Sequence, residues 1–450
     1  MAASDTQALA PHAADPHGPS GAGKPAARLP AEPDQPRRRW WAIVALACMA
    51  FFLFTPKTPS SDCIQIITVF HAVQVPLNCD SRLLAKLYRD AEKYFTEFNN
   101  WKGRPIFFLY GVAAAPVLQA VAVPLWAVIG NFAQSDRKLS HYSKYFSLHL
   151  AYYLLNIGVV LFSVWLAFNL LGLASATPLA IALSAAIATT DLAAGTVWLA
   201  HTNIFNLLAP IACAWFVRLG MQARITSAGA LYAWMGGGGL MLLVYPLFVI
   251  LLPAFIAGLA LDGLMHRGQI GALVRKAGHA AAAAILFVLP VILWSVTVRY
   301  IFSTPVYMTA QYGQFVWLAD AYHNANLWPA LSANWSAFIA SLYLHFSWFE
   351  ILLPLAGCAG LLVTGDRSQL RLADPVIPAL AIAAIGILGF NFLQGYYAAR
   401  LQVSVASLLY MLVARLAFCT GRPRIGVGVL AAIALAQFVD ASLHYAVTAE

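Results

Sequence analysis

Apolar segments about as long as a bilayer is thick alternate with short polar stretches from Trp40 to the end of the chain. An apolar run of about 20 residues can cross the hydrocarbon core as a helix, because a helix satisfies its own backbone hydrogen bonds. The pattern predicts an all-α polytopic membrane protein with roughly 11–13 transmembrane helices. The candidate spans are residues 40–55, 105–130, 147–171, 178–198, 203–217, 226–242, 244–261, 280–301, 336–362, 375–393, 403–418 and 425–443.

Composition supports this class and excludes two others. Hydrophobic residues make up 61% of the 450 residues and charged residues only 10%, whereas a soluble domain has about 25% charged residues. A soluble enzyme and a disordered chain are therefore excluded. Residues 1–39 are rich in Ala, Pro, Asp and Gly, so we expect a disordered tail there and a transmembrane domain over residues 40–450.

The basic residues predict the orientation of the chain. The net charge is +9, which we assign to cytoplasmic loops rather than to nucleic-acid binding. Arg37–Arg39 precede Trp40 and Trp41, so the tail is expected to be cytoplasmic. The same rule places 262–279, 367–371 and 422–424 inside, and 57–104, 302–335 and 394–402 outside. The Ala-rich composition suggests a bacterial inner membrane.

The middle of the chain leaves two topologies open. Arg137, Lys138 and Lys144 favour an inside loop at 131–146, and residues 218–224 also favour the inside. Two inside loops require an even number of crossings, yet three candidate helices lie between them. Either 178–198 enters from the outer face and returns to it, or a fourth crossing is present.

The long outer loop, 57–104, contains an amphipathic pattern over residues 81–98. Its apolar residues recur at helical spacing on one face, and four basic residues recur on the opposite face. That basic stripe is either a solvated face or a surface for anionic lipid headgroups. Cys63 and Cys79 flank part of the loop and could form a disulfide in an oxidising compartment. The apolar face comprises Leu84, Leu87, Ala91, Tyr94, Phe95 and Phe98, and the basic face Arg82, Lys86, Arg89 and Lys93.

Acids and one arginine on the outer side are the candidate reactive groups. Asp80 is either the N-cap of the amphipathic helix or a general base, and Asp62 is either an exposed loop acid or a base. Arg400 either pairs with a carboxylate, reaches the membrane surface or clamps a phosphate. Tyr396 and Tyr397 either stack on a sugar or belong to the interfacial aromatic belt.

Polar residues inside apolar segments favour a different class of protein. Asp191, His345 and Glu350 lie in or beside apolar runs, and intramembrane acids usually face a cavity or an ion pathway. They keep a transporter hypothesis open. The sequence has no phosphate-binding loop, no HExxH and no Cys/His cluster at ligand spacing, so we predict no metal and no cofactor. The run Gly236–Gly239 indicates close helix packing or a turn.

The layout resembles the GT-C membrane glycosyltransferases, which use polyprenyl-phosphate-linked sugars. The similar features are a first span, a long outer loop with Asp62 and Asp80, the Arg104-Pro105 entry to the next span, and the late outer segment 395–400. The resemblance implies a sugar donor of that kind, a glycan, lipid or protein acceptor, and a site facing outward. An alternative is a transporter or flippase of a lipid-linked or small hydrophilic substrate, and another is a polysaccharide polymerase or ligase.

The resemblance also implies roles for residues. Asp80 by preference, and otherwise Asp62, would take the proton of the acceptor hydroxyl. Arg400, with Lys102 or Arg104, would stabilise the departing lipid phosphate, and a single displacement would invert the sugar. Four further residues are assigned to substrate binding, namely Tyr396, Tyr397, His201 and Asn203.

Overall fold

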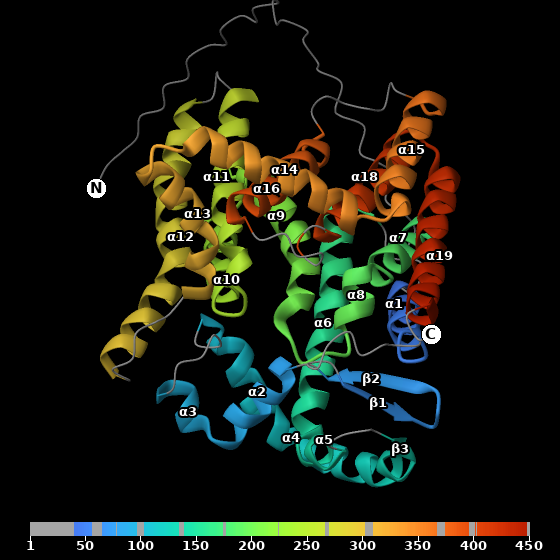
Figure 1. Cartoon of the computed structure of the whole chain (residues 1–450). Coiled ribbons are helices and arrows are strands. Elements are labelled where there is room, and N and C mark those ends of the chain that lie inside the picture. The colour runs from blue at the N-terminus through green and yellow to red at the C-terminus, as the bar shows by residue number, and fades with distance from the viewer. Residues whose placement is uncertain are drawn as a thin grey trace, which may run out of the picture. The chain divides into compact units, whose positions relative to one another are not determined.

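The computed structural model describes residues 40–55, 65–77, 79–96, 103–134, 139–173, 177–223, 225–265, 270–301, 309–366, 374–395, 401 and 403–447. Nearly all regular structure in these ranges is helical (Figure 1). Of the described helices, seven are long and apolar enough to cross a membrane, and an eighth span arises if one bent pair is counted as one. These features confirm the all-α polytopic fold. The seven are Pro105–Phe132, Phe146–Leu171, Thr202–Met221, Pro246–Met265, Ala277–Tyr300, Val376–Gln394 and Pro423–Leu443.

Some of these spans combine two consecutive labelled helices, and the other described helices lie between them. The labelled helices, spans included, have these bounds: α1 Trp40–Phe51, α2 Cys79–Arg89, α3 Ala91–Thr96, α4 Pro105–Ile129, η2 Gly130–Phe132, α5 Leu139–Lys144, α6 Phe146–Leu171, α7 Pro178–Ala188, α8 Asp191–Thr196, η3 Thr202–Ile204, α9 Phe205–Met221, α10 Ala228–Leu242, η4 Pro246–Ile250, α11 Leu251–Met265, α12 Ile270–Val296, η6 Thr297–Ile301, α13 Thr309–His323, α14 Leu327–His345, α15 Trp348–Thr364, α16 Val376–Gln394, η8 Val403–Val405, α18 Ala406–Cys419 and α19 Pro423–Val447.

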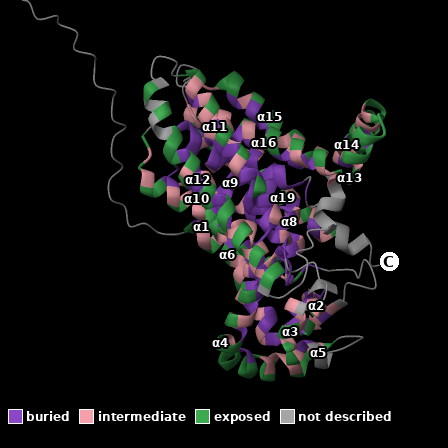
Figure 2. Cartoon of the chain, turned by 90° about the vertical axis from the view of Figure 1, so that its left-hand side faces the viewer, coloured by how far each residue is buried: buried purple, intermediate pink, exposed green. Residues whose placement is uncertain are grey.

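Helix α9 is the centre of the buried core. Almost all of its residues are buried, and α6, α11 and α16 pack against it. A helix that is apolar on every side is stable only when neighbouring helices surround it. Figure 2 shows buried residues concentrated around α9, while the outer helices keep exposed apolar faces. Such faces are expected of helices that contact lipid.

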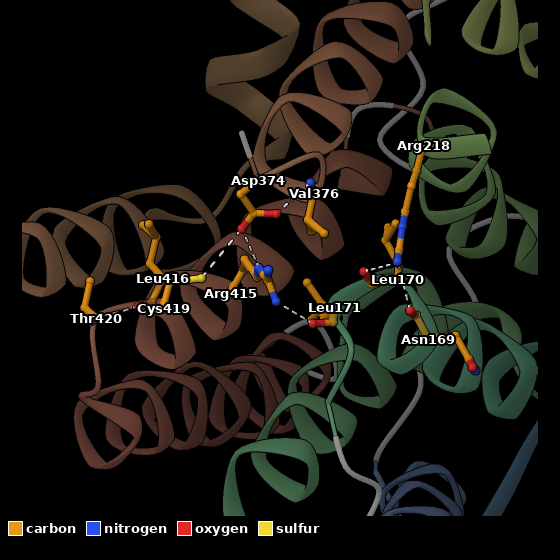
Figure 3. A network of polar contacts seen from close by, with 10 residues as sticks. All are labelled: Asn169, Leu170, Leu171, Arg218, Asp374, Val376, Arg415, Leu416, Cys419 and Thr420. Atoms are coloured by element: carbon orange, nitrogen blue, oxygen red, sulfur yellow. Dashed lines mark hydrogen bonds and ion pairs between the residues drawn. The ribbon is translucent and has the colours of Figure 1, made fainter. Parts of the chain in front are cut away.

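One end of the bundle, here called the Arg415 end, is held by a polar network (Figure 3). Arg415 Nε donates to Asp374 Oδ2 at 2.8 Å, and its Nη1 donates to the carbonyl oxygen of Leu171 at 2.8 Å. Arg218 Nη1 donates to the Leu170 carbonyl oxygen at 2.6 Å. Cationic side chains thereby satisfy carbonyl groups that a helix C-terminus leaves open. The network joins the last turns of α6, α9 and α18 to the start of α16.

The first loop contains a β-hairpin that the sequence analysis does not predict. Strands β1 (Gln65–Val69) and β2 (Val73–Leu77) pair antiparallel, and β1 also pairs with the short β3 (Ala133–Gln134). The rings of Phe70 and Phe132 stack beside the sheet at 4.6 Å. Since β1 and β3 share backbone hydrogen bonds, the loop 57–104 and residues 131–134 lie on the same side of the membrane. Helix α4 is long and apolar enough to cross, but it therefore begins and ends on one side, and the expectation that 105–130 crosses is wrong.

This pairing corrects the predicted topology. The basic residues predicted that 131–146 lies on the opposite side from 57–104, and for residues 131–134 that prediction is wrong. The Leu171 carbonyl in turn lies at the Arg415 end with the last turn of α9. The two loops that follow α6 and α9 therefore share one side. Three basic residues near 131–146 misled the charge rule, which counts charges and does not register strand pairing.

The segment 178–198 is divided into two short helices. Thr177 caps α7 and Thr190 caps α8, because each side-chain oxygen accepts a backbone N–H of the following turn, at 3.2 Å and 3.3 Å. At about 1.5 Å per residue, α7 is about 16 Å long, which is half of the hydrocarbon core. A single straight span over 178–198 is therefore absent.

The amphipathic helix of the first loop is present but interrupted. Residues 81–89 and 91–96 are helical, a turn at Asp90 separates them, and residues 97–98 lie outside the described part. Leu84, Leu87 and Tyr94 of the predicted apolar face are buried, while Lys86 and Arg89 of the basic face are exposed. Ala91 is exposed, because the turn at Asp90 shifts the register of the second helix.

The predicted span 336–362 bends instead of crossing in one piece. Helices α14 and α15 meet at an angle of 88°. The Ser347 backbone N–H donates to Glu350 Oε2 at 3.1 Å, which starts α15 as a capping box. Trp317 Nε1 and Asn334 Nδ2 donate to the carbonyl oxygens of Leu393 and Phe392, at 3.0 Å and 2.9 Å. The segment 302–335 therefore meets the end of α16.

Candidate functional site

Arg104 is a cation fixed at the beginning of α4. Its Nη1 donates to Thr202 Oγ1 at 2.6 Å, and its guanidinium carbon lies 5.3 Å from the ring centre of Tyr245. Pro105 follows as the first residue of α4, where a missing N–H costs no hydrogen bond. The hydroxyl and the ring come from two other segments, so three parts of the chain converge on one guanidinium. We call this end of the bundle the Thr202 end.

The turn His201-Thr202-Asn203 has a defined geometry. His201 Nδ1 accepts the backbone N–H of Asn203 at 2.9 Å, so the proton of the neutral imidazole resides on Nε2. His201 and Thr202 are buried. The turn leads directly through η3 into α9. The structure therefore brings the predicted residues Arg104, His201 and Asn203 to one place, joined through Thr202.

Asn156 supports this turn and was missed in the sequence analysis. It is fully buried in α6, and its Nδ2 lies within hydrogen-bond distance of three carbonyl oxygens, those of Thr196, Val197 and Leu199, at 3.2, 3.1 and 2.6 Å. Non-helical backbone at membrane depth is stable only when such partners satisfy it. An amide inside an apolar 26-residue helix was the sequence signal for this role.

The helices of the first loop pack beside Arg104. The rings of Tyr94 in α3 and Phe108 in α4 stack at 4.0 Å, and Tyr88 in α2 contacts Tyr145 at 6.5 Å. Helix α2 begins at Cys79, so Asp80 lies within its first turn rather than ahead of it. An acid in the first turn of a helix interacts favourably with the helix dipole. The side chain of Asp80 lies outside the described residues.

The other predicted site residues also lie outside the described part of the chain. They are Asp62, Lys102, Tyr396, Tyr397 and Arg400. Their roles stay predictions. Among the described residues on either side of the segment 396–400, Asn391 Nδ2 donates to the carbonyl oxygen of Leu401 at 3.0 Å. Directly after Leu401, η8 packs against α9, the helix that begins at the His201-Thr202-Asn203 turn.

The chemistry available here is anion binding. A guanidinium presents a planar fork of donors that matches a phosphate. Thr202 and Tyr245 hold the guanidinium of Arg104 in a fixed orientation. Within the described ranges, no group of three His, Cys, Asp or Glu side chains could hold a metal ion.

Comparison with known proteins adds no assignment. No protein-family model matches the chain, and no match was found among the curated proteins or the solved structures that we compared with it.

Proposed function

We propose that the protein is a membrane-embedded glycosyltransferase of the GT-C type. It transfers a sugar from a polyprenyl-phosphate donor to an acceptor hydroxyl at the Thr202 end. The observation that carries the proposal is the Arg104 guanidinium, held by Thr202 and Tyr245 next to the helices of the first loop. A fixed cation at this place suits the phosphate of a lipid-linked donor.

The transfer is a single displacement at the anomeric carbon. The acceptor oxygen forms the new bond while the bond from that carbon to the phosphate oxygen breaks, and the electron pair leaves with the lipid phosphate. Asp80, or otherwise Asp62, takes the proton of the acceptor hydroxyl. Arg104, with Arg400 and Lys102, stabilises the negative charge that grows on the phosphate. No general acid is needed because the phosphate leaves as an anion.

The environment of the site accounts for a lipid-linked substrate. Helix α4, which begins directly after Arg104, exposes a row of valines along its length, among them Val117, Val121 and Val128. A polyprenyl tail can lie against such an apolar face while its phosphate contacts Arg104. The acceptor is a glycan, lipid or protein hydroxyl, and the enzyme acts at the outer face of the bacterial inner membrane.

The test measures release of polyprenyl phosphate from radiolabelled polyprenyl-phosphate hexoses and pentoses by the protein in nanodiscs. We expect Asp80→Asn to lower release by about 10³-fold and Arg104→Gln by about 10²-fold. Arg424→Gln is the matched control, because Arg424 is an exposed cation at the start of α19, close to the Arg415 end. Full release in both Asp80→Asn and Asp62→Asn contradicts the mechanism, and no release by the unaltered protein contradicts the function.

A proton-coupled transporter or flippase is the second candidate. The observation that favours it is the burial of Glu350 beside two further acids. A transporter moves its substrate across the bilayer with every bond intact. Recovery of unaltered lipid-linked sugar on the opposite side of a vesicle, without release of polyprenyl phosphate, distinguishes it from the transferase.

A further inference from the structure

Glu350 is a fully buried acid at the bend between α14 and α15. Its relative exposure is 0%. One carboxyl oxygen, Oε2, accepts the backbone N–H of Ser347 at 3.1 Å. The other oxygen, Oε1, has no hydrogen-bond partner in the described part of the chain. One half of the carboxyl group therefore caps a helix, and the other half has no assigned role.

Two further acids lie near this carboxyl group. Asp191, the first residue of α8, and Asp440 in α19 interact with Glu350 electrostatically. Both are partly exposed. Among the described residues no ion pair of Glu350 is found. Helix α8 packs against η3, so the three acids lie towards the Thr202 end.

A buried chain of hydrogen bonds adjoins the acids. Thr189 Oγ1 donates to Gln437 Oε1 at 2.5 Å, and Gln437 Nε2 donates to the Tyr410 hydroxyl oxygen at 2.7 Å. Tyr410 interacts electrostatically with Glu350 and Asp191. Because its oxygen accepts from Gln437, the Tyr410 hydroxyl can turn its own proton towards a carboxylate. The groups that face Glu350 thus come from α8, α18 and α19, while the side chain of His345 in α14 lies outside the described residues.

We propose that Glu350, with Asp191 and Asp440 beside it, is a binding site for one proton that exchanges with water at the Thr202 end. An ionised carboxylate at 0% exposure next to like charges is strongly disfavoured, because neither solvent nor a cation compensates it. Binding adds a proton to a carboxylate oxygen, and release returns it to water. The partly exposed acids Asp191 and Asp440 connect the buried carboxyl group with the solvent.

The proposal goes beyond sugar transfer and differs from a purely structural role. As a capping residue, Glu350 would need only an acceptor for the Ser347 N–H, and Gln serves equally at that position. Glu350→Gln is therefore expected to keep the fold and to remove only the ionisable group. This variant separates capping from proton binding.

The experiment is infrared spectroscopy of the full-length protein in nanodiscs at neutral pH. We expect the carbonyl stretch of a protonated carboxylic acid, which shifts in D2O and on glutamate-specific carbon-13 labelling. Glu350→Gln is expected to lose this band at an unchanged melting temperature. Asp320→Asn is the control and is expected to keep it, because Asp320 is an exposed acid on α13.

Each outcome decides the proposal, whether or not the variant folds. The labelling arm uses the unaltered protein, so the absence of a carbon-13-sensitive band at neutral pH overturns the assignment even if Glu350→Gln fails to fold. A band that disappears when potassium salt is replaced by sodium salt assigns the site to a metal cation and also overturns it. The spectra do not depend on turnover, so they remain informative if the transferase assay fails.

Discussion

At the scale of single residues, Asp374 joins two helices through one carboxylate. Its Oδ2 accepts from Arg415 Nε at 2.8 Å, and its Oδ1 accepts the backbone N–H of Val376 at 3.0 Å. Burial alone would raise the pKa of Asp374, but the hydrogen bonds from Arg415 and Val376 outweigh it and hold the pKa below its usual value. Figure 3 shows this carboxylate between the start of α16 and the last turns of α18.

We expect Asp374→Asn to lower the free energy of unfolding by about 2 kcal/mol, because Arg415 then keeps a half-buried charge without its counter-ion. The matched control is Asp90→Asn. Asp90 pairs with Lys93 at 2.9 Å, but both side chains are 36% exposed. Asp90→Asn is therefore expected to lower the free energy of unfolding by less than about 1 kcal/mol. The measurement is the melting temperature of the purified protein in detergent at neutral pH.

The same pair predicts a dependence on pH. The pKa of Asp374 is lower in the folded protein than in the unfolded chain. Its contribution is therefore fully present above the unfolded value of about 4 and is lost as pH falls through the lower folded value. The difference in melting temperature between the unaltered protein and Asp374→Asn should be constant from pH 7 to about 5 and shrink in stronger acid. A difference that grows in acid contradicts this account.

Single residues were easiest to recognise as candidates where their chemistry is rare in the sequence. Arg104 and His201 stand out because charged and imidazole groups are scarce in so apolar a chain, and the structure joins them through Thr202. Asn156 did not stand out, although its amide holds the turn in place. A sequence shows that an amide is buried in a helix but not which distant carbonyl groups it will reach.

At the scale of elements, the glycines of α10 show how helices approach one another. A Cβ atom at Gly239 would collide with the Phe287 carbonyl oxygen of α12, whereas one at Gly236 would meet open space. The sequence left packing and a turn as alternatives for this run. The structure has a continuous helix from Ala228 to Leu242, which decides for packing.

We expect Gly239→Ala to destabilise the protein by about 1–3 kcal/mol, because α10 and α12 must separate to admit the methyl group. Gly236→Ala is the matched control in the same helix. It is expected to be neutral or to stabilise by less than about 1 kcal/mol, since alanine favours a helix over glycine. Melting temperatures in one detergent check both. Equal decreases in melting temperature in the two variants would show that the close approach of α10 to α12 at Gly239 is not the cause of the destabilisation.

Other elements carried signals that hydropathy does not register. The bend before α15 occurs at Ser347, followed three residues later by Glu350, which is the sequence pattern of a capping box. The hairpin lies in a stretch of β-branched residues on both sides of a turn at Phe70 and His71, which have positive φ. Apolar periodicity identifies helices long enough to span a membrane, but caps and strand pairing decide where they end.

At the scale of the whole molecule, the all-α polytopic class was easier to predict than the number and direction of the spans. Roughly 11–13 spans were expected, whereas seven described helices, or eight spans with the bent pair, are long and apolar enough to cross, because hydropathy alone also selects the shorter helices Trp40–Phe51, Pro178–Ala188 and Val403–Cys419. The direction of each span depends on the side of the membrane assigned to the loop before it. One loop assigned to the wrong side therefore inverts the direction of the spans that follow, until a later loop is assigned from its own charges. The pairing of β1 with β3 and the contacts of Leu171 at the Arg415 end place 131–134 and the loop after α9 on opposite sides. An odd number of crossings between them is then required, and the conflict that the charges produced disappears.

This arrangement predicts which loops share a side of the membrane. Ala72 in the hairpin and Asn131 after α4 are exposed near the small sheet, and Ile225 is 80% exposed in the loop that follows α9. We expect Ala72→Cys and Asn131→Cys to react with a membrane-impermeant maleimide from one side, and Ile225→Cys from the other. Labelling of intact cells and of inverted vesicles, each compared with the parent protein, measures this.

Reaction of Asn131→Cys from the same side as Ile225→Cys would restore the charge-based topology and separate β3 from β1.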